Sequence, residues 1–127
     1  MTRDEQTVRE LFAALDAGNT QAALELMTED VLFRFGSAPP SVGREDVAAN
    51  ATAMATVVAS LSHKLLAVWT VEDPQPAVIG EAAVTYERHD GSRLTLPCVS
   101  VFRLREGRVA DYRIYMDINP VFAPQAV

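Results

Sequence analysis

The chain opens with apolar residues at helical spacing. Over residues 4–17 they recur every three or four positions, which predicts an amphipathic helix. These positions are Val8, Leu11, Phe12 and Leu15. Gly18 is a typical helix terminator and Asn19 a typical N-cap, so a second, short helix is expected directly after the first. The two helices should form a hairpin.

The apolar period changes to two from Asp30 onward. Apolar residues at 31, 33 and 35 flank Leu32 and Arg34, which predicts a short strand. Residues 36–41 contain Pro39 and Pro40 and read as a loop, since proline donates no backbone hydrogen bond. An alanine-rich third helix is expected to begin near Arg44. Its apolar stripe is Val47, Ala51, Met54, Val58 and Leu61.

The rest of the chain predicts four consecutive strands, at residues 63–71, 77–88, 93–105 and 108–116. Residues 73–76 form the first connection, and Asp90-Gly91 and Glu106-Gly107 are strong hairpin signals. These short connections predict an antiparallel meander. Pro97, inside the third of these strands, indicates a bulge or an unpaired edge position.

Helices come first and strands later, an order typical of an α+β fold with the helices on one face of a curved sheet. The chain has 127 residues, enough for a single domain spanning residues 1–127. Its 49% apolar content is sufficient to form a core.

Charge and cysteine content exclude several classes of function. The net charge of −6 argues against a nucleic-acid partner, because such a partner requires phosphate neutralisation. A single cysteine excludes an internal disulfide and a cysteine-based zinc cage. We expect no metal and no cofactor, since the two histidines lack ligand spacing and no nucleotide-binding glycine motif is present. The charged N-terminus and the lack of long apolar runs predict a cytoplasmic protein without a membrane partner.

Three local motifs, together with the element order, carry a resemblance to a known family. They are FAALDAGN at residues 12–19, Gly43-Arg44, and FRLREGRV at residues 102–109. The chain resembles the nuclear transport factor 2-like superfamily, in its branch of SnoaL-like polyketide cyclases and ketosteroid isomerase-like and limonene epoxide hydrolase-like proteins. The resemblance implies a cone-shaped α+β barrel, in which three N-terminal helices pack on a strongly curved antiparallel sheet and enclose an apolar pocket. It also implies a homodimer formed through the sheet, whose exposed face would carry Val99, Val101 and Tyr115.

The chemistry of the limonene epoxide hydrolases carries over only in part. Their Glu-Arg-x-Asp motif is similar to residues 87–90 here, so Arg88 and Asp90 match two of the three groups that activate water and protonate the epoxide. The third group falls at Ile114, and the water-holding residues fall at Phe33 and Phe35. These side chains cannot accept a proton.

Two other chemistries of the branch match less well. The oxyanion-hole residues of ketosteroid isomerase fall near Leu11 and Ser100, and its general base falls near Phe33 or Arg34. The polyketide cyclases use an Asp, often with a His, for which Asp117 and His63 are the candidates by residue type.

These comparisons lead to one set of candidate site residues. For catalysis we expect Asp90 as acid or base, Arg88 as its electrostatic partner, His63 as an alternative base and Tyr112 as a hydrogen-bond donor. The expected lining of the substrate pocket is Phe33, Phe35, Met54, Trp69, Tyr86, Leu96, Cys98, Ile114 and Asp117.

Each candidate also has a purely structural interpretation. Asp90 precedes a glycine in a hairpin turn, Asp117 can bond backbone amides at a strand end, and Cys98 can be a small buried hydrophobe. Two hypotheses therefore stay open. The first is an enzyme that transfers protons on an apolar metabolite, through cyclisation, isomerisation, dehydration or epoxide opening. The second is a non-catalytic protein that binds a hydrophobic ligand or serves as a dimeric interaction module.

Overall fold

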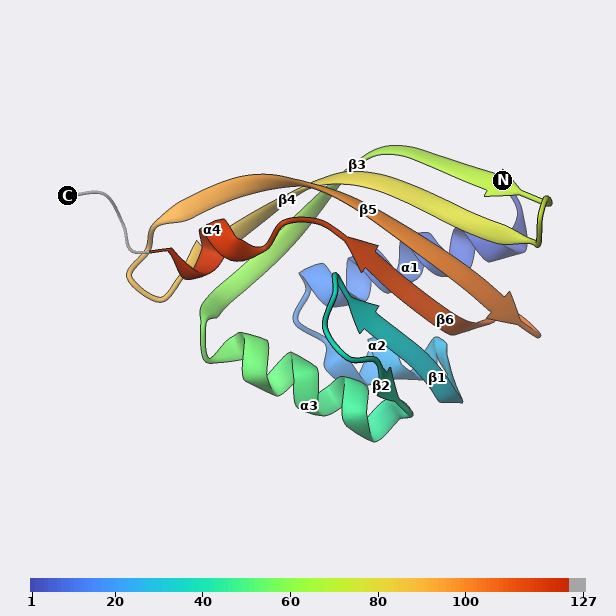
Figure 1. Ribbon diagram of the computed structural model, residues 1–127, viewed down its shortest axis with the longest axis horizontal. Helices are drawn as coiled ribbons and strands as arrows, with labels where there is room; N and C mark the ends of the chain where they lie inside the picture. The colour runs from blue at the N-terminus through green and yellow to red at the C-terminus, as the bar shows by residue number, and fades with distance from the viewer. Residues whose placement is uncertain (124–127) are drawn as a thin grey trace.

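Ten elements make up a single curved sheet with helices packed against one face, as the sequence predicts (Figure 1). The computed structural model describes residues 1–123. In chain order the elements are α1 (Arg3–Asp16), α2 (Thr20–Glu25), β1 (Met27–Phe35), β2 (Ser41–Val42), α3 (Arg44–Ala55), β3 (Val58–Val71), β4 (Ala77–Arg88), β5 (Arg93–Arg105), β6 (Arg108–Tyr115) and α4 (Asn119–Phe122). Within the described residues, no helix is both long and apolar enough to cross a bilayer.

The first two helices form where the sequence predicts them, although α1 lies one residue earlier at each end and α2 ends at Glu25. The Thr2 hydroxyl accepts a hydrogen bond from the Glu5 amide at 3.0 Å and caps α1. Gly18 adopts a positive φ of 70° just after α1, a conformation that favours glycine. The Asn19 side chain then caps α2 by accepting from the Ala22 amide at 3.0 Å. The predicted hairpin is thus confirmed.

The strands from β3 to β6 form the predicted antiparallel meander. The strand order of the whole sheet is β2-β1-β6-β5-β4-β3. β1 lies parallel to β6, and the sheet stays open because β2 and β3 are its two edges. The register between β4 and β5 runs through Pro97 without a bulge. Pairing of β5 with β6 begins only at Val99, so Pro97 lies where β5 has a neighbour on one side only.

Four features differ from the sequence-based expectation. α3 ends at Ala55, and Val58 and Leu61 belong to β3, which starts five residues earlier than expected. The β-branched pair at 57 and 58 ends the alanine-rich helix and extends the strand along β4. β1 likewise begins earlier, at Met27, and the short elements β2 and α4 were not expected. Residues 1–123 therefore contain four helices instead of the expected three.

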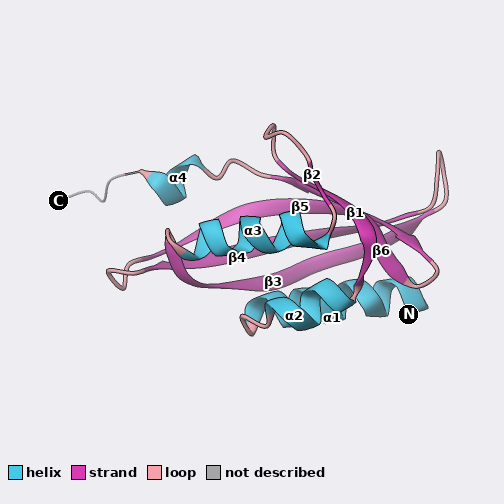
Figure 2. Ribbon diagram, turned by 90° about the horizontal axis from the view of Figure 1, so that it is seen from below, coloured by secondary structure: helices cyan, strands magenta, loops and turns pink. Residues whose placement is uncertain are grey.

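The core lies between the helices and the face of the sheet toward them, here called the inner face. α1, α2 and α3 lie on the same side of the sheet (Figure 1), and the view from the helix side shows α1 beside β3 and α3 in front of the central strands (Figure 2). Phe12 packs edge-on against Phe102 at 5.5 Å, and Phe102 stacks on Tyr112 at 4.5 Å. The Phe12 ring also packs over Gly80, where an added Cβ would lie at van der Waals distance, 3.4 Å from the ring.

Candidate functional site

A histidine and an aspartate meet on the inner face at the end of α1. His63 of β3 places its Nδ1 2.6 Å from one Asp16 carboxylate oxygen. The other carboxylate oxygen accepts the His63 backbone N–H at 3.0 Å. The His63 side chain is 9% exposed and that of Asp16 28%. Asp16 was not among the residues predicted from the sequence.

Asp16 occupies a position that is unfavourable on local grounds alone. It is the last residue of α1, where the helix dipole is negative, and the last turn contains no basic side chain. β3 is an edge strand, so its outward N–H groups need partners. The tertiary contact satisfies both needs, because the carboxylate covers the strand edge and faces the imidazole. An acid at the C-terminus of a helix was the local signal that could have identified Asp16.

This contact fixes the orientation of the imidazole and its tautomer. An ionised carboxylate can only accept hydrogen bonds, so the proton of the neutral ring resides on Nδ1. Nε2 then carries the lone pair, and no hydrogen-bond partner for it lies within the described residues. The Phe12 ring, 4.7 Å away between centroids, supports the imidazole from one side. This arrangement is suited to general acid–base chemistry.

Two buried tyrosines and a cysteine lie on the same inner face. The Tyr86 hydroxyl donates to the Met116 sulfur at 3.5 Å, and burial, with a smaller contribution from Cys98, raises the pKa of Tyr86 to about 12. Burial also raises the pKa of Tyr112, and the charges of Cys98 and Asp16 add to the rise. The Cys98 sulfur lies 3.7 Å from the Ser100 hydroxyl, and burial raises the pKa of the Cys98 thiol. These groups are therefore neutral near pH 7, and the tyrosines are hydrogen-bond donors.

Most of the predicted pocket lining is found on this inner face. Phe33, Phe35, Met54 and Leu96 pack against the core and remain only partly buried, whereas Ile114 is buried. Phe33 lies 5.2 Å from the Tyr112 ring, edge to face. Apolar side chains that point inward and stay partly exposed mark a place where the helices do not fully cover the sheet.

Arg88 and Asp90 are not part of this cluster. Arg88 donates to the backbone carbonyls of Pro120 at 2.8 Å and Val121 at 3.1 Å, which attaches α4 to the end of β4. Asp90 is exposed in the turn after β4, where it accepts from the Ser92 amide at 2.9 Å and the Ser92 hydroxyl at 2.6 Å. These bonds lower the pKa of Asp90, and the charge of Arg88 has a smaller effect. Arg88 also donates to the Ser92 hydroxyl at 3.2 Å, so Arg88 and Asp90 do not pair directly and are linked only through Ser92 in the turn.

Two further predicted residues lie away from the inner face. Trp69 is 49% exposed and is paired with Ile79 on the opposite side of the sheet. A register shift between Leu65 and Ala67 moves it there, since one extra residue reverses the alternation of inward and outward side chains. Asp117 is exposed and accepts from the Asn119 amide at 3.0 Å, just before α4.

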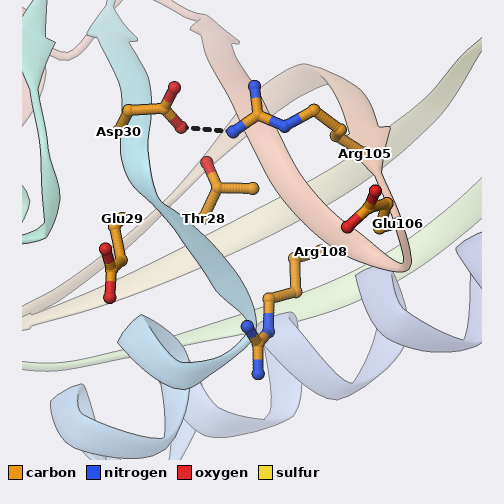
Figure 3. Close-up of a pocket in the computed structure, with 6 residues that line it drawn as sticks. All are labelled: Thr28, Glu29, Asp30, Arg105, Glu106 and Arg108. Carbon is orange, nitrogen blue, oxygen red and sulfur yellow. Dashed lines mark hydrogen bonds and ion pairs between the residues drawn. The ribbon is translucent and has the colours of Figure 1, made fainter.

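A hollow in the described part of the chain is charged and lies away from these residues. It has a volume of about 450 Å³ and is lined by Thr28, Glu29, Asp30, Arg105, Glu106 and Arg108 (Figure 3). Arg105 pairs with Asp30 at 2.6 Å and lowers the pKa of that carboxyl. Three acids and two bases at an exposed position do not form the apolar pocket that the resemblance implies.

The curved sheet and its helices define the class: this is a nuclear transport factor 2-like fold. The chain belongs to the SnoaL-like domain family, whose model matches residues 8–112.

Solved structures support this assignment. A protein of unknown function from Burkholderia pseudomallei, described as nuclear transport factor 2-like, superposes with a TM-score of 0.86 at 19% identity, over 97% of this chain and all of that one. Bal32a, from a soil-derived mobile gene cassette, superposes with a TM-score of 0.78 at 28% identity, over 94% of this chain and 93% of that one. A putative polyketide cyclase from Xanthomonas campestris superposes with a TM-score of 0.78 at 23% identity, over 93% of each chain.

Proposed function

We propose that this SnoaL-like protein is an enzyme that transfers protons on a small apolar metabolite. The observation that carries the proposal is the His63–Asp16 pair, in which a carboxylate holds an imidazole with its second nitrogen free. The reaction is a cyclisation, isomerisation, dehydration or epoxide opening. Putative polyketide cyclases and an LEH-like epoxide hydrolase share the fold, which supports chemistry of this kind.

In the proposed mechanism His63 is the base and Asp16 its positioning residue. Nε2 takes a proton from an acidic C–H or O–H group of the substrate, and the Asp16 carboxylate stabilises the imidazolium that forms. The imidazolium then returns the proton to another atom of the substrate. An isomerisation or cyclisation of this type consumes no net proton and needs no further reactant.

The tyrosines supply the complementary hydrogen bonds. Tyr86 pairs with Leu61, and His63 pairs with Val84, so Tyr86 and His63 are diagonal neighbours on the inner face. The Tyr86 hydroxyl donates only to a thioether, a weak acceptor, and can therefore turn to a substrate oxygen that gains negative charge. Tyr112 lies deeper, stacked on Phe102, and is the second candidate donor.

The substrate expected here is an apolar molecule with one carbonyl, hydroxyl or epoxide oxygen. The partly exposed inner residues Phe33, Phe35, Met54 and Leu96 supply apolar contact surface, whereas the polar groups beside it are few. A strongly charged ligand would find no matching charge on this face.

A second candidate function is binding of a hydrophobic ligand without chemistry. Phe33, Phe35 and Ile114 occupy positions at which the epoxide hydrolases of the branch would hold and activate water, and Arg88 is engaged with α4. In this case the same apolar surface binds a ligand and releases it unchanged.

The test begins with a thermal-shift screen of terpenoid, steroid and aromatic polyketide compounds, followed by mass spectrometry of each compound that binds. His63→Gln and Asp16→Asn should lower turnover by about 100-fold or more while ligand binding stays, since general acid–base catalysis contributes 10²–10⁴-fold. The matched control is Glu25→Gln on the exposed side of α2, which should leave turnover unchanged.

The other outcomes separate the hypotheses. Full turnover in both site variants refutes the His63–Asp16 assignment, and a loss confined to Asp90→Asn would move the chemistry to the β4–β5 turn. Binding of a compound that is recovered unchanged at every pH supports the non-catalytic function.

A further inference from the structure

The charged hollow of Figure 3 lies at an irregularity of the sheet. The pairing of β1 with β6 is interrupted between Met27 and Leu32, where residues 28–31 of β1 lie opposite the single residue Ala110. A strand with extra residues bends away from its neighbour at that point, and such bulges are common beside functional sites. Residues 28–30 line the hollow from β1, and the turn ends of β5 and β6 line it from the other side. The hollow, about 450 Å³ in volume, is thus built into the backbone of the sheet.

One side chain in the hollow is buried and has no partner. Thr28 is only 8% exposed, and no residue among 1–123 forms a hydrogen bond with its buried hydroxyl oxygen. Figure 3 shows this oxygen turned toward the Asp30–Arg105 ion pair, which lines the same hollow. A buried hydroxyl without a partner destabilises the folded state, so this group points to an acceptor that the described chain does not supply.

The positive charges around the hollow are only partly neutralised. Arg105 and Arg108 are in register across the β5–β6 hairpin, where two like charges repel each other. Asp30 pairs with Arg105 at 2.6 Å, but Arg108 has no ion-pair or hydrogen-bond partner in the described chain. The guanidinium group of Arg3 adds to this charge, since it packs on Gly107 in the turn. Arg108 is therefore free to bind a carboxylate, for which a guanidinium group has the matching geometry.

Two carboxylates that line the hollow are unpaired as well. Glu29 and Glu106 are exposed, and neither side chain has a hydrogen-bond or ion-pair partner within the part of the chain that the structure describes. Figure 3 shows them on opposite sides of Thr28, with the Arg108 side chain between them. Acceptors for an ammonium group thus lie in the same hollow as donors for a carboxylate.

We infer that the charged hollow binds a free amino acid in its zwitterionic form. The ligand carboxylate is bound by Arg108 and accepts a hydrogen bond from the Thr28 hydroxyl, and the ligand ammonium group is bound by Glu29 or Glu106. A ligand with negative charge alone would meet the three acids of the hollow, and one with positive charge alone would meet its arginines. A ligand that carries both signs is therefore favoured.

The charged hollow and the His63–Asp16 pair lie at opposite ends of α1. Arg3, the first residue of the helix, packs on the β5–β6 turn, and Asp16, the last residue, contacts His63. A helix of 14 residues is about 20 Å long. Binding in the hollow can therefore be measured without reference to turnover at His63, and it stands or falls independently of the proposed reaction.

Nuclear magnetic resonance titration of the intact, isotope-labelled protein tests the site, with the standard amino acids as probes at constant pH. At least one amino acid should bind with a Kd below about 1 mM and shift the amide signals of residues 28–30 and 105–108, while the His63 amide stays unchanged. Acetate and methylamine each carry only one of the two charges, and both should bind at least about 10-fold more weakly.

Variants test the role of each group. Thr28→Val keeps the shape of the side chain and should weaken binding by about 10-fold, whereas the thermal midpoint of the free protein should stay equal or rise because an unpaired hydroxyl is removed. Arg108→Met should weaken binding by at least about 10-fold, and the double variant Glu29→Gln/Glu106→Gln by a similar factor. The matched control Arg93→Met removes the same charge at the other end of β5 and should leave the affinity unchanged.

Four outcomes would overturn the inference or one of its contacts. The site is refuted if no amino acid shifts these amide signals, or if Arg108→Met and Thr28→Val both bind with full affinity. Acetate that binds as tightly as the best amino acid identifies an anion site and overturns the zwitterion. A lower thermal midpoint in Thr28→Val shows that the hydroxyl bonds within the protein, which overturns its role as a ligand donor.

Discussion

Replacing Asp16 by alanine should destabilise the protein measurably, because two contacts depend on its carboxylate. One oxygen accepts the His63 amide at 3.0 Å, and the other lies 2.6 Å from Nδ1. Hydrogen bonds to charged groups contribute about 1.5–3 kcal/mol each, and the 28% exposure of the carboxylate argues for the lower end of that range. Two bonds at the lower end amount to about 3 kcal/mol.

One opposing effect must be subtracted from this value. A carboxylate at the C-terminus of a helix is repelled by the dipole, and its removal returns about 0.5 kcal/mol. The expected loss for Asp16→Ala is therefore about 2.5 kcal/mol, and that for Asp16→Asn about 1 kcal/mol, since the amide keeps one acceptor oxygen.

Urea unfolding followed by tryptophan fluorescence and circular dichroism measures this loss. The midpoint should fall while the slope stays constant. His63→Ala removes the ring contact but keeps the backbone N–H, so a cycle of Asp16→Ala, His63→Ala and the double variant isolates the ring contribution, expected at about 1–1.5 kcal/mol. A loss below about 0.5 kcal/mol in Asp16→Ala would refute the reasoning, because single surface substitutions reach that size.

Three other predictions follow from single contacts. Arg88→Met should loosen α4 and lower the hydrogen-exchange protection of the α4 amides. The control variant Arg93→Met, at the start of β5, should leave that protection unchanged. Equal protection of α4 in both variants would contradict its attachment by Arg88. Burial raises the pKa of Tyr86 to about 12 from an unfolded value near 10, so the free energy of unfolding should be intact below pH 10 and fall as the pH rises toward 12. Tyr86→Phe should remove part of that fall in alkaline unfolding experiments. Glu106 has a positive φ of 53° in the β5–β6 turn, so Glu106→Asn should raise the free energy of unfolding by about 0.5–1 kcal/mol in urea, and a loss would show that the side chain has another role.

The fold could be predicted because its signals are local. Helical spacing around Phe12, the cap at Asn19 and the hairpin turns each depend on a few neighbouring residues, and all three appear in the structure. The end of α3 was misplaced because the apolar stripe continues at helical spacing through Val58 and Leu61, although both belong to β3. The β-branched pair at 57 and 58 is a weak local signal for the end of the helix, and pairing with β4 decided the conformation.

The candidate site depended on contacts that the sequence does not record. Asp16 and His63 are 47 positions apart, and only the packing of α1 on β3 brings them together. Arg88 was expected to pair with Asp90, but β4 ends at Arg88 and Asp90 lies in the turn. Trp69 was expected in the pocket lining, but a register shift that cannot be read from residue types turns it to the other face of the sheet.

The parallel pairing of β1 with β6 determines when this protein can complete its structure during synthesis. β1 comes early in the described chain, whereas its neighbour β6 leaves the ribosome about eighty residues later, so closing this pair carries a large loop entropy. The meander from β3 to β6 consists of adjacent hairpins and can assemble first. Until β6 is made, the strand available to β1 in the described chain is the two-residue β2, so the apolar side chains of β1 stay largely uncovered and expose this early segment to aggregation.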